Sequence, residues 1–222
     1  MRLSYSLPVP CLCLVTDRKL CGDDVLEGRI AAAVSGGVGM VQLREKDMPA
    51  GELLQLARKL RSITKDKALL VINDRLDVAL AAEADGLHLP EDSIAAHDAK
   101  RVTSSRLLVS KAVHDLAGAR LAAREGADYL VLGTIFPTSS KPGVKTGGLD
   151  PITDVTRVVD TPVLAIGGID STNAASVIEA GAKGVAVITA ILGASDPEKA
   201  ARDIQQSMMA AWEDSEETAL QS

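Results

Sequence analysis

The chain has 222 residues, of which 46% are hydrophobic and 24% are charged, an ordinary balance for a globular protein. Its formal charge of −6 argues against a nucleic-acid-binding protein, which is usually basic, and no apolar run reaches the roughly 18 residues of a membrane span. We therefore expect a cytoplasmic protein that has no nucleic-acid or membrane partner and no signal peptide. Because only 2% of the residues are aromatic, the core must be aliphatic, as in parallel strands that are buried on both faces.

The three cysteines, Cys11, Cys13 and Cys21, lie near the N-terminus. An odd number of clustered cysteines does not indicate a disulfide framework, and no Cys or His pair follows at the spacing of a zinc site. We expect buried, reduced thiols.

Eight short apolar segments alternate along the chain with stretches of helical spacing. This alternation predicts βαβ units and a parallel sheet. Eight units in a chain of this length predict an α/β protein with a closed (β/α)8 TIM barrel. The alternative, an open doubly wound sheet, lacks a Gly-x-Gly-x-x-Gly motif after the first strand. In chain order, the predicted strands are 11–17, 40–46, 68–74, 86–90, 107–113, 129–135, 162–168 and 184–190.

No linker or low-complexity insert divides the chain, so we expect a single domain over residues 1–222 with its core at about 11–212. The polar, acidic segment 213–222 is expected to be a frayed, disordered tail.

The second predicted strand ends in charged residues instead of turn residues. Side chains alternate between the faces of a strand, so Gln42, Arg44 and Lys46 share one face, and Leu43 and Glu45 lie on the other. If the aliphatic face packs under the helices, two cations point into the barrel mouth and suit a polyanion. Alternatively, the two cations pair with carboxylates of neighbouring strands and close the top of the barrel.

Two glycines, Gly167 and Gly168, end the seventh predicted strand, and a helix follows the eighth. In TIM barrels the loops after strands seven and eight commonly bind phosphate. The sequence therefore predicts a second anion pocket, although the glycines alone are also compatible with a plain tight turn.

Carboxylates follow strands three and four. Asn73 and Asp74 end one strand, and Asp92 comes shortly after the next. Paired carboxylates beside phosphate-binding cations suggest Mg²⁺. Alternatively, Asp74 caps the helix that starts near Leu76. A long loop, 135–148, follows strand six. It is either a binding loop or lid, or a flexible loop without a functional role.

Five segments resemble, in order and at similar spacing, the motifs of the thiamine-phosphate synthase family. The resemblance runs from about Leu14 to Ala200. It implies a TIM-barrel transferase of thiamine biosynthesis that joins two small molecules, an aminomethylpyrimidine pyrophosphate and a thiazole phosphate, with release of pyrophosphate. The segments are VQLREK, VINDRLDVALAAEADGLHL, GADYLVLGTIFPTSSK, AIGGI and GVAVITAI.

The resemblance also implies roles for individual residues. The segment from Gln42 through Leu43, Arg44, Glu45 and Lys46, together with Asn73, would bind the pyrimidine pyrophosphate. Asp74 and Asp92 would bind Mg²⁺. Thr138 and Ser140 would meet the thiazole, Ser139 would also bind substrate, and Gly168, Ile188 and Thr189 would bind the thiazole phosphate. The catalytic cations would be Arg44, Lys46 and Lys141, which help pyrophosphate to leave before the thiazole nitrogen captures a pyrimidine cation.

The chain departs from the family pattern at three places. Ala112 stands where a serine is usual, with Ser110 one step deeper on the same face. The loop after strand four is shortened to Pro90-Glu91-Asp92, which makes Asp92 less secure as a ligand than Asp74. Thr189 replaces a serine and keeps the hydroxyl group.

Two other functions remain open. A sister family, the thiazole tautomerases, uses a histidine at the end of strand five as proton shuttle, and His114 stands there. A non-catalytic thiamine-phosphate sensor is the third candidate. We expect His88 to be a core residue and His97 to lie on a helix surface. The sequence is compatible with a homo-oligomer but does not determine the oligomeric state.

Overall fold

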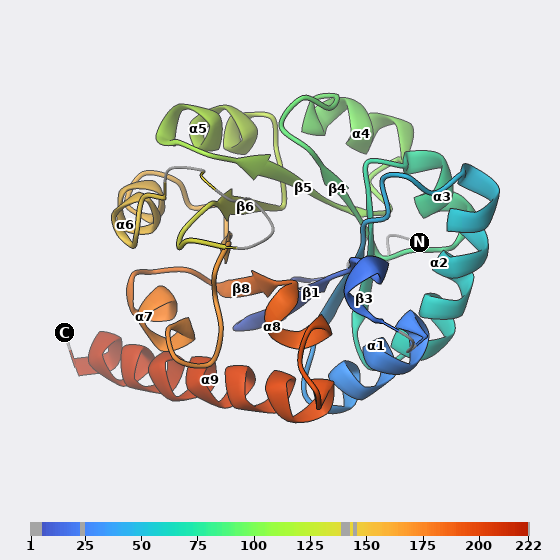
Figure 1. Ribbon diagram of the computed structural model, residues 1–222. Coiled ribbons are helices and arrows are strands. Elements are labelled where there is room, and N and C mark those ends of the chain that lie inside the picture. Colours follow the sequence, from blue (N-terminus) through green and yellow to red (C-terminus); the bar gives the residue numbers. More distant parts are fainter. Residues whose placement is uncertain (1–5, 23–24, 139–142, 144–145, 222) are drawn as a thin grey trace.

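The computed structural model describes residues 6–22, 25–138, 143 and 146–221, with the backbone alone for 216–221. Eight parallel strands form a closed barrel in which each strand pairs with the next and β8 pairs with β1 (Figure 1). This confirms the predicted TIM barrel. The strands are β1 (Cys11–Val15), β2 (Met40–Leu43), β3 (Leu69–Asn73), β4 (Gly86–Leu89), β5 (Leu108–Val113), β6 (Tyr129–Gly133), β7 (Val163–Ile166) and β8 (Gly184–Val187).

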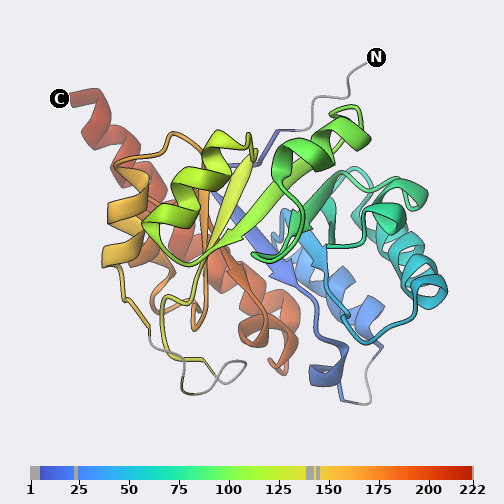
Figure 2. The same cartoon turned by 90° about the horizontal axis from the view of Figure 1, so that it is seen from above.

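Helices surround the barrel, and residues 6–10, before β1, lie on the opposite side of it from the short 3-10 helix η1 (Arg18–Leu20) (Figure 2). No described helix is long and apolar enough to cross a membrane. The α-helices are α1 (Leu26–Ser35), α2 (Ala50–Thr64), α3 (Leu76–Ala81), α4 (Ala96–Val102), α5 (Leu116–Arg124), α6 (Asp150–Thr156), α7 (Ala174–Glu179), α8 (Thr189–Leu192) and α9 (Pro197–Gln221).

The long helix α9 lies across α1 and α7 and closes the ring of helices (Figure 1). It continues to Gln221, so the expectation of a disordered tail from residue 213 is wrong for the backbone of 213–221. The segment contains three glutamates, which favour helix, and it extends a helix that tertiary contacts have already started.

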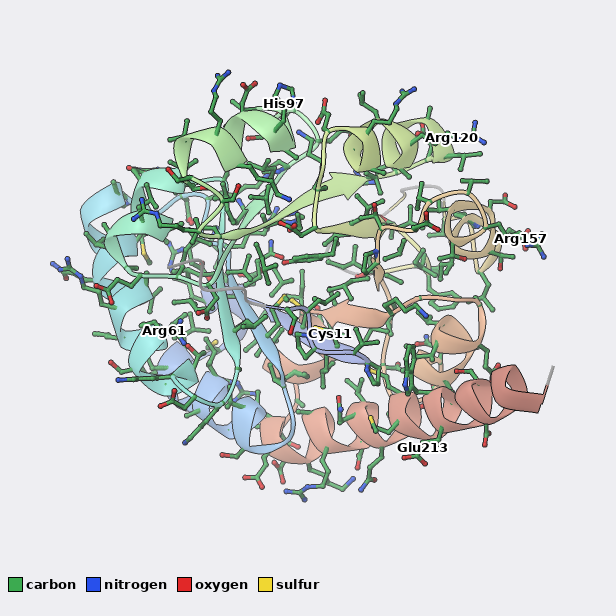
Figure 3. All side chains as sticks on the ribbon, turned by 180° about the vertical axis from the view of Figure 1, so that it is seen from behind. Cys11, Arg61, His97, Arg120, Arg157 and Glu213 are labelled. Carbon is green, nitrogen blue, oxygen red and sulfur yellow. The ribbon has the colours of Figure 1, made fainter. Side chains whose placement is uncertain are left out.

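Strand alternation divides the core into two layers. Inward-facing residues such as Cys11, Cys13 and Met40 fill the barrel, and Figure 3 shows Cys11 there. Leu12 and Leu14 instead pack between the strands and the helices. All three cysteines are buried and free, as predicted. Burial raises the pKa of the Cys13 thiol to about 12, which makes it a poor nucleophile.

Two carboxylates, the buried Asp85 and the partly buried Asp128, join helices to strands at the amino end of the barrel. Asp85, directly before β4, accepts hydrogen bonds from the Leu70 amide at 2.7 Å and from Arg61 Nη1 at 2.6 Å. Asp128, directly before β6, makes equivalent contacts with Lys100 and a β5 amide. Each carboxylate therefore ties a preceding helix and strand to the strand that follows.

We predict that Asp85→Ala lowers the free energy of unfolding by about 3 kcal/mol, because it leaves a buried amide and a half-buried guanidinium without their acceptor. Denaturant unfolding followed by circular dichroism measures the loss. Asp98→Ala is the control, since Asp98 pairs with the exposed Arg101 on the surface of α4 and should cost less than about 1 kcal/mol. Equal losses in the two variants would contradict this role of Asp85.

Candidate active site

A cavity of about 760 Å³ opens at the carboxyl ends of the strands. Residues that end or follow β2 to β8 line it, and TIM-barrel enzymes hold their active sites at this rim. Its volume is in the range of pockets that bind small molecules.

One wall of the cavity is basic. Gln42, Arg44 and Lys46 line it, as the alternation in β2 predicts. Arg44 and Lys46 form no ion pair with any residue that the structure describes, so carboxylates of neighbouring strands do not neutralise them. Asn73 lies beside Gln42, with 3.4 Å between Gln42 Nε2 and Asn73 Oδ1. This wall therefore offers two cations and two amide side chains to an anion.

Two residues of the same predicted segment turn away from the cavity. Leu43 packs in the layer between strands and helices, and Glu45 is buried against Arg18 with 2.8 Å between Oε2 and Nη1. The structure thus does not bring either side chain to the site. Sequence reasoning missed Arg18, because no strand pattern shows which side chain of the first loop meets the second loop.

A second wall is built by the ends of β7 and β8, where Gly167, Gly168, Ile188 and Thr189 line the cavity. Gly168 has φ 64°, and a Cβ atom there would overlap the Pro137 carbonyl oxygen. The turn therefore requires glycine and packs closely against the chain after β6. Exposed backbone amides of such a turn, followed by a helix start, suit a phosphate group.

The two predicted metal ligands, Asp74 and Asp92, lie near the same loop after β4, but only one of them lines the cavity. Asp92 lines the cavity, whereas Asp74 does not. Asp74 Oδ1 accepts a hydrogen bond from Ser93 Oγ at 2.7 Å, in the loop that carries Asp92. The helix cap of α3 is Arg75 and has no side-chain cap bond, so Asp74 does not serve as the cap.

This donor set fits Mg²⁺. The described residues contain no group of three His, Cys, Asp or Glu side chains that could hold a metal ion. Mg²⁺ is commonly held by one or two protein carboxylates while substrate phosphates and water supply the other oxygens, and Asp74 and Asp92 provide two carboxylates. Asp92 makes no hydrogen bond or ion pair within the described part of the chain, so its oxygens are available.

A buried lysine supports the loop after β4. Lys111 lies on the outer face of β5, and its Nζ donates to the carbonyl oxygens of Ser93 and Ile94 at 3.0 and 3.1 Å. The shortened loop that carries Asp92 is therefore fastened both to Asp74 and to the neighbouring strand.

His88 is buried, as expected, but it also lines the cavity. Its Nδ1 lies 2.9 Å from Ser110 Oγ. Burial, and then the charges of Arg44 and Lys111, lower the pKa of His88 to about 3, so the imidazole is neutral near pH 7. Ser110 therefore pairs with His88, and the cavity wall at Ala112 lacks the usual serine hydroxyl group.

His114 also lines the cavity. Its Nδ1 lies 2.5 Å from the Gly133 carbonyl oxygen and so donates to it, which directs Nε2 toward Glu91, 3.6 Å from Oε2. His97 is exposed on α4, as predicted (Figure 3).

The loop after β6 is described only in part. Thr138 lines the cavity. The predicted site residues Ser139, Ser140 and Lys141 lie outside the described residues.

We predict that His88 makes stability depend on pH. Its pKa is about 3 in the folded chain and about 6.5 when unfolded, so below pH 6.5 the unfolded state binds more protons and stability falls as pH falls. From pH 6.5 to 5, the unfolding free energy of the wild type should fall relative to His88→Gln by up to about 1.4 kcal/mol per pH unit. Denaturant unfolding of both proteins at several pH values measures this difference in unfolding free energy. A difference that stays the same from pH 6.5 to 5 would contradict the prediction.

The fold and the cavity together define a (β/α)8-barrel enzyme that acts on small anionic substrates at its carboxyl rim. Residues 12–191 match the family model described as thiamine monophosphate synthase. The chain belongs to this family, whose members are transferases of thiamine biosynthesis. This confirms the resemblance seen in the sequence.

Individual relatives agree with this assignment. A thiamine-phosphate synthase of Roseiflexus sp. (strain RS-1) is 41% identical over 203 residues, which cover 90% of this chain and 86% of the relative. A putative thiamine-phosphate synthase of Geobacter sulfurreducens is 43% identical over 193 residues, covering 86% and 91%. The solved structure of a thiamine phosphate pyrophosphorylase from Pyrococcus furiosus superposes with a TM-score of 0.83 at 34% identity and covers 90% of this chain and 96% of its own.

Proposed function

We propose that this chain condenses 4-amino-2-methyl-5-(diphosphooxymethyl)pyrimidine with a thiazole phosphate to give thiamine phosphate and pyrophosphate. The observation that carries the proposal is a cavity with two separate anion sites. Arg44 and Lys46, which pair with no carboxylate in the part of the chain that the structure describes, lie on one wall, and the Gly167–Gly168 turn lies on another. Two phosphorylated substrates require two such sites.

The basic wall suits the pyrophosphate. When the bond between the pyrimidine methylene carbon and the pyrophosphate oxygen breaks, the electron pair stays on the oxygen and negative charge grows there. A cation about 4 Å from a unit charge contributes roughly 4 kcal/mol at an effective dielectric constant of about 20. Cations that are already in place stabilise this charge without reorganisation, so Arg44 and Lys46 act electrostatically. By the family resemblance, Lys141 adds a third cation.

Asp74 and Asp92 would hold Mg²⁺ beside this wall. When bound, the ion neutralises charge on pyrophosphate oxygens. Gln42 and Asn73 donate hydrogen bonds from their amide groups, and these bonds orient the leaving group.

The glycine wall suits the thiazole phosphate. Gly168 and the start of α8 at Ile188 and Thr189 supply backbone amides, and Thr189 adds a hydroxyl group. By resemblance, Thr138 and Ser140 contact the thiazole, and Ser139 also binds substrate. Val131 and Ile166 line the space between the walls and offer apolar surface to the two rings, so the thiazole nitrogen can donate its lone pair to the methylene carbon.

One observation favours a second candidate. His114 lines the cavity and directs Nε2 toward Glu91, an arrangement suited to proton transfer in a thiazole tautomerase. A tautomerase, however, binds no pyrophosphate and has little use for the cations Arg44 and Lys46. A non-catalytic sensor would not need them either, so the synthase accounts for more of the site.

We predict that Arg44→Ala and Asp74→Ala each lower coupling by at least about 10²-fold, because each removes stabilisation of the departing pyrophosphate. His114→Ala should retain much of the activity. Pyrophosphate release from both purified substrates, with Mg²⁺ and with chelator, measures the effect. Equal rates with chelator, or complete loss in His114→Ala together with wild-type isomerisation of the thiazole, would contradict the synthase.

We predict that Gly168→Ala raises the KM for the thiazole phosphate about tenfold or more and changes the KM for the pyrimidine pyrophosphate much less. The new methyl group would displace the turn, which requires a left-handed backbone conformation. Gly28→Ala is the matched control, because Gly28 lies in α1 and a Cβ atom there meets no neighbour within 4 Å. Steady-state kinetics with each substrate varied in turn separate the two constants, and an equal rise in both would contradict the assignment.

A further inference from the structure

Arg18, in η1 after β1, joins two loops at the carboxyl rim without lining the cavity. Its backbone N–H donates to Glu45 Oε1 at 3.1 Å, and its Nη1 donates to Glu45 Oε2 at 2.8 Å. The same guanidinium binds Asp47 through two bonds, Nη1 to Oδ1 at 2.7 Å and Nη2 to Oδ2 at 3.1 Å. One arginine therefore engages two carboxylates of the loop after β2.

These carboxylates alternate with the cations of the basic wall. Along the chain the order is Arg44, Glu45, Lys46, Asp47. Glu45 and Asp47 contact Arg18, whereas Arg44 and Lys46 line the cavity. The loop is also held from β1, because the Arg44 amide donates to Thr16 Oγ1 at 2.9 Å.

This alternation has an electrostatic consequence. Two carboxylates next to two cations would normally pair with them, since opposite charges at salt-bridge distance attract and side chains of this length reach one another. Within the described residues, Glu45 and Asp47 pair with Arg18 and Lys19 instead. The Glu45 side chain is only 3% exposed, so its position is determined by packing as well as by charge.

We propose that Arg18 is a positioning residue that sequesters Glu45 and Asp47, and so keeps Arg44 and Lys46 available to the pyrophosphate group of the substrate. This inference rests on the proposed function and extends it to a residue outside the cavity. Without the Arg18 side chain, Glu45 loses its ion-pair partner and Asp47 keeps only Lys19. Both carboxylates can then turn toward the neighbouring cations and compete with the incoming anion.

Inorganic pyrophosphate is the probe, and calorimetric titration of the purified full chain in the presence of Mg²⁺ is the measurement. Arg18→Met should weaken pyrophosphate binding about 10- to 100-fold while affinity for the thiazole phosphate changes less than about twofold. Arg18→Lys keeps the charge but loses the paired contact with Asp47, so its affinity for pyrophosphate should lie between those of the wild type and Arg18→Met. Lys59→Met is the matched control, because it removes an exposed ion pair with Glu27 between α2 and α1, and it should bind pyrophosphate like the wild type.

A combined variant tests the cause. Arg18→Met with Glu45→Gln and Asp47→Asn removes the competing charges, so pyrophosphate affinity should recover at least in part. Equal pyrophosphate binding by wild type and Arg18→Met would overturn the role of Arg18, as would equal weakening of both ligands or the absence of any recovery. If the wild type itself binds no pyrophosphate, the proposed function fails at this wall. Unfolding curves for each variant, with Arg18→Lys as the mildest change, separate these outcomes from a loss of fold.

Discussion

Closure of the parallel barrel is the constraint on which the other features depend. In a closed sheet no strand has a free edge, so every strand residue faces either the barrel interior or the surrounding helices. The same alternation places Cys13 inside and Leu14 outside within β1. Continued past the end of β2, it directs Arg44 into the cavity and Glu45 away from it. The geometry of the core is thus also the geometry of the site.

The site depends on two cations, Arg44 and Lys46, that have no ion-pair partner within residues 6–22, 25–138, 143 and 146–221. Cations near one another at a cavity mouth repel each other, and an isolated cation would gain by pairing with any carboxylate within reach. The fold limits this pairing by giving two acidic groups other partners, since Glu45 contacts Arg18 and Asp74 accepts from Ser93. A barrel supplies such partners because adjacent loops at one rim come from adjacent strands. Positive potential is therefore maintained before substrate arrives, which is the condition for electrostatic catalysis without reorganisation.

Much of this could be predicted from the chain alone. The eight strands, the inward face of Gln42, Arg44 and Lys46, and the glycines after β7 follow from periodicity and from the polar ends of apolar runs, which are local properties. The contacts of Arg18 with Glu45, 27 residues away, and of Lys111 with the loop at Ser93 could not be predicted, because they depend on the relative placement of loops. The helical end of α9 was missed for a related reason, since a polar segment can extend a helix that packing has already started.

The sequence by itself determined the barrel, the face of β2 that carries the cations, and membership in its family, because side-chain alternation and ordered motifs are written along the chain. Only the tertiary structure decided that Arg44 and Lys46 form no ion pair with a described residue, that Ser110 is engaged by His88, and that Asp74 is bound to Ser93 and is not a helix cap. The physical reason is that a charged or polar side chain takes whichever partner lies within hydrogen-bonding distance. Distances between strands and loops remote in sequence exist only after the barrel has closed.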